Sequence, residues 1–81
     1  MTAFLNRDAA RMAVAEYAEK ALEAAQEFDD ARKQVGINMR AEDHAMAEVS
    51  RVAVSHYATC AQVYAATATA VAAALETGAI R

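Results

Sequence analysis

The sequence lacks the residues that usually interrupt helices. It contains no proline and no tryptophan, and its only glycines are Gly36 and Gly78. Because proline and glycine break helix interiors, their scarcity across 81 residues predicts an all-α chain. The single cysteine, Cys60, excludes a framework of intrachain disulfides. The eight basic residues are scattered and the formal net charge is −3, which argues against a nucleic-acid partner.

Large apolar side chains are also few, whereas alanine occurs 24 times. Alanine is the best helix former because it loses no side-chain entropy on folding. It adds little apolar area to a core, however, compared with leucine or phenylalanine. A chain this short with such a core is rarely stable alone. We therefore expect a single domain over residues 1–81 that associates with itself, as a dimer or higher oligomer, or with another helical protein.

Two long helices are predicted, over about residues 3–35 and about residues 39–77, with a turn at 36–38. Gly36 suits the left-handed position that ends a helix, and Gly78 suits the same position after the second helix. Because the turn is so short, the two helices should form an antiparallel hairpin. The candidate N-caps of the first helix are Thr2, Asn6 and Asp8.

The first helix is amphipathic, with one broad apolar face. At 100° per residue, this face comprises Ala10, Val14, Tyr17, Ala18, Ala21, Leu22, Ala25, Phe28, Ala31 and Val35. The opposite side carries six acids and one lysine between Glu16 and Asp30. We interpret these acids as a solvated face that keeps the protein soluble.

The second helix has two apolar stripes. From Val52 to Leu75 it runs 24 residues without a formal charge, and ten of these are alanine. A surface helix would carry charges on its solvent side, so more than one face must be covered. One stripe is assigned to the first helix, giving an intrachain core of Val14, Tyr17, Ala21, Phe28, Val49, Tyr57, Cys60, Tyr64, Val71 and Leu75. The second stripe is assigned to an oligomer interface of Ala45, Val52, His56, Val63, Ala70 and Ala74.

A second copy across a two-fold axis is the simplest partner for the second stripe. Two hairpins would then form a four-helix bundle, a homo-oligomer with the second helix of each copy in the middle. We find no catalytic or cofactor signature. His44 and Glu48 share a face but lack the inward-facing carboxylates of a di-iron bundle, and Cys60 is interpreted as a small buried apolar side chain. We therefore expect no enzyme, no cofactor, no metal and no small-molecule substrate.

The leading hypothesis is a non-enzymatic, cytoplasmic hairpin that acts as a small structural, adaptor or regulatory subunit through protein–protein contacts. An unpaired cysteine fits a reducing compartment, and the first residues lack the basic and apolar segments of a secretory signal. A single-span membrane protein with residues 52–75 in the bilayer is an alternative, since 24 residues can cross it. The polar side chains of Ser55, His56 and Gln62 would make that span costly.

A small secreted helical hairpin is the other alternative. The two-helix layout and the alanine content are similar in outline to the Trp-x-Gly hairpin substrates of type VII secretion. The chain departs from that family at both of its motifs. The turn reads Gln34-Val35-Gly36-Ile37 without a tryptophan, and the residue four positions after Tyr64 is Ala68 instead of an acid.

Overall fold

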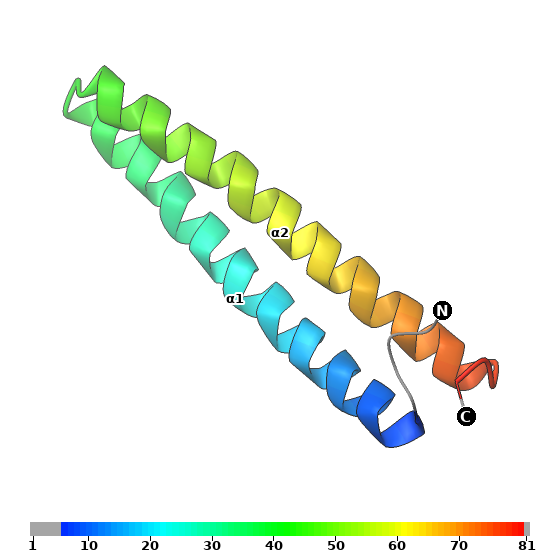
Figure 1. The fold of residues 1–81 in the computed structure, drawn as a ribbon. Coiled ribbons are helices and arrows are strands. Elements are labelled where there is room, and N and C mark those ends of the chain that lie inside the picture. The colour runs from blue at the N-terminus through cyan, green and yellow to red at the C-terminus, as the bar shows by residue number, and fades with distance from the viewer. Residues whose placement is uncertain (1–5, 81) are drawn as a thin grey trace.

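The computed structural model describes residues 6–80 and contains two helices that pack side by side in opposite directions (Figure 1). Helix α1 spans Arg7–Arg40 and helix α2 spans His44–Glu76. The chain measures 56 × 19 × 15 Å along its principal axes. The prediction of an all-α, two-helix hairpin is confirmed. The proposed N-cap Thr2 and a helix start at residue 3 lie outside the described residues.

Both helices begin at a side chain that caps free backbone N–H groups. The Asn6 side-chain oxygen accepts a hydrogen bond from the Ala9 backbone N–H at 2.8 Å, and Asp43 does the same for Met46 at 3.1 Å. Each cap satisfies one of the four N–H groups that have no partner within the helix. Asn6 was one of the predicted caps for the first helix. The second helix begins after Asp43, instead of directly after the predicted turn at residues 36–38.

The turn between the helices lies at residues 41–43, so the prediction of a turn at 36–38 is wrong. Glu42, with φ 59°, occupies the left-handed position instead of Gly36. The Asp43 N–H donates to the Asn38 carbonyl at 2.9 Å, and the Glu42 N–H donates to the Met39 carbonyl at 3.1 Å. These two bonds make a Schellman motif, which closes a helix around one left-handed residue.

A buried polar contact explains why α1 continues past Gly36. Asn38 is 8% exposed, and its side-chain amide donates to the Ser50 hydroxyl of α2 at 3.1 Å. Its side-chain oxygen accepts from the Gln34 amide at 3.1 Å, one turn back on α1. Buried polar groups need such partners, because leaving one unsatisfied costs about 1–3 kcal/mol. The contact therefore favours a helical conformation at Asn38 and through Gly36.

The two glycines should respond to alanine in opposite directions. Gly36 is helical, and a Cβ added there would meet only the flexible Arg40 side chain, at 3.6 Å. Gly36→Ala should raise the free energy of unfolding by about 0.5–1 kcal/mol, since alanine is the better helix former. Gly78 has φ +76°, so Gly78→Ala should lower it by about 1 kcal/mol. Urea unfolding measures both. A destabilised Gly36→Ala variant would contradict a helical Gly36.

The largest apolar cluster lies at the end of the rod away from the turn. After α2, the Ala79 N–H donates to the Ala74 carbonyl at 3.0 Å, a second Schellman motif around Gly78. This folds Ile80 back onto the hairpin, where it forms a buried cluster with Ala10 and Val71. Ala74 and Leu75, near the end of α2, are partly buried against this cluster.

Small side chains fill the rest of the seam between the helices. No large side chain among residues 6–80 is fully buried. Most of the expected core residues lie partly buried along the seam: Val14, Tyr17, Ala21, Phe28, Tyr57, Cys60, Tyr64 and Leu75, with Val71 fully in the buried class. Small residues let the two helix backbones approach closely.

Val49 departs from the predicted core, because it is 59% exposed. The buried positions at this end of α2 are Ala47 and Ser50, at 0% and 7% exposure. A seven-residue apolar repeat drifts by about 20° per heptad around an ideal helix. Near the turn, the residues of α2 that face α1 therefore no longer coincide with the predicted stripe, and Val49 lies outside the contact. The hydrogen bond to Asn38 also holds Ser50 inward.

Candidate functional site

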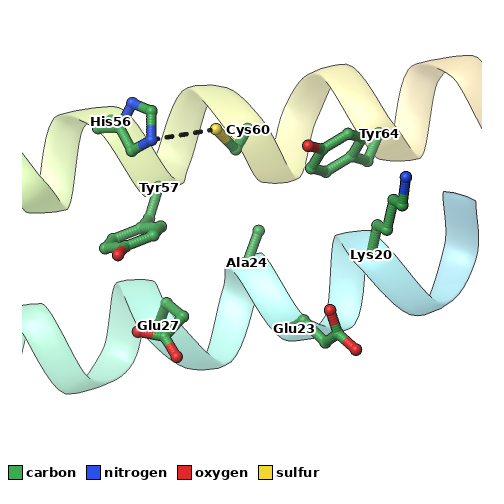
Figure 2. A pocket seen from close by; sticks show the side chains of 8 residues that line it. All are labelled: Lys20, Glu23, Ala24, Glu27, His56, Tyr57, Cys60 and Tyr64. Carbon is green, nitrogen blue, oxygen red and sulfur yellow. Dashed lines mark hydrogen bonds between the residues drawn. The ribbon is translucent and has the colours of Figure 1, made fainter.

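Two grooves run along the hairpin. The first has a volume of about 450 Å³ and is lined by both charged and aromatic side chains (Figure 2). Its lining residues are Lys20, Glu23, Ala24, Glu27, His56, Tyr57, Cys60 and Tyr64. The second has a volume of about 540 Å³ and is lined only by apolar side chains: Ala18, Ala21, Leu22, Ala25, Ala61, Ala65 and Ala68. At 100° per residue the two sets fall on opposite sides of the seam.

Tyr64, at one end of the first groove, stacks on Tyr17 next to it. The rings of Tyr17 and Tyr64 lie 6.2 Å apart with an interplanar angle of 30°. The Lys20 ammonium lies 5.6 and 5.9 Å from the two ring centroids and 3.4 Å from the Glu16 carboxylate. Ring faces attract cations, so this lysine is held by the aromatic pair and by Glu16. The sequence placed both tyrosines on the seam, and the structure brings them into direct contact.

His56 and Cys60 meet at the other end of the first groove. The His56 Nε2 and the Cys60 Sγ lie 3.6 Å apart, one helical turn from each other on α2. The His56 ring also makes an edge contact with the Tyr57 ring, at 5.3 Å between centroids. His56 is exposed and Cys60 is partly buried. The two residues were predicted to lie on different stripes of the second helix, whereas in the structure both line one groove.

The predicted oligomer interface is mostly open in the single chain. Val52 and Val63 are 64% and 55% exposed. Ala45, His56 and Ala70 are also exposed. Ala74 differs, because it is half-buried and packs against the cluster of Ala10, Val71 and Ile80. Most of the stripe is therefore exposed on α2 in the single chain, whereas Ala74 also packs in the hairpin's own core.

The apolar groove was not predicted as a separate surface. Helical periodicity predicts Ala18, Leu22 and Ala25 on the broad apolar face of the first helix. That face spans about 180° of the helix at 100° per residue, which is more than one partner helix can cover. The uncovered part includes Leu22, which is 72% exposed. The width of this apolar face was the feature of the sequence that indicated that part of it would remain exposed.

Helix α2 is long and apolar enough to cross a membrane by length and composition alone. Its most apolar 18-residue window has a mean hydropathy of 1.3, and only 6% of that window is buried in the hairpin. Much of the apolar surface of α2 is therefore exposed in the single chain. The chain matches no family model, no curated protein and no solved structure.

Proposed function

We propose that the chain is a non-enzymatic hairpin module that associates with itself and acts by protein–protein contacts. In this proposal two hairpins pair into a four-helix bundle, with α2 of each copy in the middle and α1 outside. The assembled bundle would serve as a small structural, adaptor or regulatory subunit in the cytoplasm. Its acidic side on α1 stays in solvent and keeps the assembly soluble.

The excess surface of the single chain carries this proposal. A compact monomer of 8.6 kDa exposes about 4,700 Å², whereas this chain exposes 5838 Å². The difference of about 1,100 Å² is similar to the roughly 800 Å² that each partner buries in a stable interface. Pairing with a second copy would cover much of this excess.

The exposed valines of α2 support the choice of face. Val52 and Val63 lie eleven residues apart on the same side of α2, with the exposed His56 between them and the exposed Ala45 and Ala70 beyond them. A two-fold axis through this stripe would bury the same set of residues on both copies. The acids Glu19 and Asp30 of α1 are exposed and would lie at the outer edge of the bundle.

The helical geometry around His56 and Cys60 argues against nucleophilic catalysis. A cysteine–histidine enzyme needs backbone or side-chain donors aimed at the developing oxyanion. Both residues lie in the interior of the 33-residue helix α2, where each backbone N–H already bonds to a carbonyl four residues back. The backbone beside Cys60 therefore offers no free donor, and a non-enzymatic role is the proposal that the site supports.

A membrane span is the second candidate, because α2 passes the length and hydropathy criteria and is 6% buried over its most apolar window. The acidic helix α1 packs along α2 in the hairpin, and placing its six acids between Glu16 and Asp30 in a bilayer would be very costly. Insertion would therefore require the two helices to separate.

Absolute mass in solution tests the proposed function. Light scattering on a sizing column should give twice the chain mass or a higher even multiple, over a range of protein concentrations and without detergent. A folded monomer at all concentrations would contradict self-association. An aggregate that dissolves only in detergent would support the membrane candidate instead.

A further inference from the structure

The apolar groove is a separate surface from the valine stripe of the proposed dimer. On α1 its lining includes Leu22, which is 72% exposed. On α2 it includes Ala61 and Ala65, and Val63 lies about 160° around the helix from both of them at 100° per residue. Pairing of two chains through the valine stripe would therefore leave this groove open.

Positive charge gathers on the groove side of α1, although the basic residues are scattered along the sequence. At 100° per residue, an arc of about 120° holds every groove residue of α1 together with most of the basic residues of that helix and only one acid, Asp29. The basic residues in the arc are Arg7, Arg11, Arg32, Lys33 and Arg40. This side of α1 is therefore positive, whereas the chain has a formal net charge of −3.

Two arginines stand in line with the groove, one beyond each end of it. Arg11 is seven residues before Ala18, and Arg32 is seven residues after Ala25. Residues seven apart differ by only about 20° around a helix, so both arginines lie on the groove side. They are 21 residues apart on α1, which corresponds to about 30 Å along the helix axis.

Both arginines are available to a carboxylate from outside the chain. Arg11 and Arg32 are exposed. Within residues 6–80, Arg32 makes no ion pair, and its guanidinium lies 5.7 Å from the centre of the Phe28 ring. Arg11 pairs with Asp8 at 3.8 Å, where both side chains are more than half exposed. Such exposed pairs are weak, so neither guanidinium is committed within the hairpin.

A second copy of the chain does not match this surface. Two copies that met groove to groove across a two-fold axis would bring their basic sides together. The apolar run of α2, from Val52 to Leu75, has no acid to offer. Most acids of α1 lie outside the arc that holds its groove residues. The charge therefore favours a partner other than this chain.

A membrane surface does not match it either. Helices that lie in a membrane interface insert large apolar side chains such as tryptophan, phenylalanine and leucine. Apart from Leu22, the groove is lined only by alanine, which offers little apolar area to lipid. Alanine walls instead let another helix backbone approach closely.

We propose that the apolar groove binds an amphipathic helix of a different, acidic protein. The apolar face of that helix would fill the groove, as in other helix-in-groove complexes. Its acidic side chains, about 21 residues apart, would pair with Arg11 and Arg32. The inference rests on the proposed function of acting by protein–protein contacts, and it adds the chemistry of the partner.

A pair of synthetic helices tests the groove and its charge preference. Each is a dye-labelled peptide of about 28 residues, about 42 Å long, with leucine and alanine on one face and glutamine elsewhere. One carries glutamate in its first and last turns, and the other carries lysine there. Fluorescence anisotropy with the full chain should show at least about tenfold tighter binding of the glutamate helix. The difference should shrink as salt is added, because the ion pairs are exposed.

Arg32→Glu should weaken binding of the glutamate helix about fivefold or more and strengthen binding of the lysine helix. One exposed ion pair contributes up to about fivefold in affinity, and the new carboxylate adds repulsion. Lys20→Glu is the matched control, because it changes the net charge equally but lies at the first groove. It should change either affinity less than about twofold.

A bulky polar side chain in the groove tests the apolar contact separately. Ala25→Gln should weaken binding of both helices, whereas Glu23→Gln, which introduces the same side chain at the first groove, should not. Circular dichroism checks that each variant stays helical. Val63→Glu should still bind the glutamate helix, so a failure of self-association and a failure of the groove are distinguishable.

Three results would overturn the inference. The first is equal affinity for the glutamate and lysine helices. The second is a fall in the mass of the chain to that of a monomer when the glutamate helix is added, because a second copy would then occupy the groove. The third is binding to phosphatidylglycerol vesicles but to neither helix, which would assign the basic side to a membrane surface.

Discussion

Replacing Ala47 with leucine is expected to lower the melting temperature of the hairpin by about 10 °C or more. Ala47 is fully buried near the turn, on the face of α2 that contacts α1. Overpacking a tight contact costs about 1–3 kcal/mol, and each kcal/mol shifts the melting temperature of a domain this size by about 4–8 °C. Thermal unfolding followed by circular dichroism, at one fixed protein concentration, measures the effect.

Ala66→Leu is the matched control for this prediction. Ala66 is on the same helix but is exposed in the single chain, so an added leucine there does not crowd the contact between α1 and α2. Surface substitutions of this kind usually change stability by less than about 0.5 kcal/mol. Equal melting temperatures for Ala47→Leu and the wild type would mean that the helices are not in close contact at Ala47.

Replacing Val63 with glutamate should weaken self-association at least about 100-fold without unfolding the hairpin. Val63 is 55% exposed in the single chain, so the new carboxylate is solvated in the monomer. In the proposed bundle the same carboxylate would be buried without a partner, at a cost of about 3 kcal/mol or more. That cost corresponds to about 100-fold in Kd. Sedimentation equilibrium gives the constant, and circular dichroism confirms that helix content is retained.

Two further variants identify the face that pairs. Gln62→Glu adds the same charge at the neighbouring exposed position, about 100° away around α2, and should leave the dimer intact. Leu22→Glu adds it to the apolar groove on the other side of the seam. An unchanged mass for Val63→Glu together with a monomeric Leu22→Glu would assign the interface to the apolar groove and contradict the valine stripe.

The helices were predictable from the sequence because their cause is local. Alanine content, the lack of proline and the spacing of apolar residues act within a few residues of each other. The end of α1 was not predictable in the same way. Gly36 is the best local stop signal, but the hydrogen bond between Asn38 and Ser50 joins two helices and carries α1 on to Arg40. A strained Glu42 then takes the left-handed position that the glycine was expected to fill.

The candidate site was predictable only in part, because some of its features depend on how the two helices pack against each other. The stripe of Val52 and Val63 follows from helical periodicity alone, and the structure leaves both exposed. Which residues of α1 line the first groove with His56 and Cys60 depends on the register of the two antiparallel helices, and moving the turn from 36–38 to 41–43 changes that register. No spacing within the linear sequence reports which residues of α1 lie across from Cys60.

The start of α1 and the end of α2 lie together at one tip of the rod. The Arg7 guanidinium donates to the Leu75 carbonyl at 3.2 Å, and the turn lies at the opposite tip of a 56 Å rod. Any polypeptide attached before α1 and any attached after α2 would therefore leave from the same place. The hairpin has the geometry of an insertion that can be placed in a surface loop of a host protein and extend from it as a spacer, presenting residues 41–43 far from the attachment point.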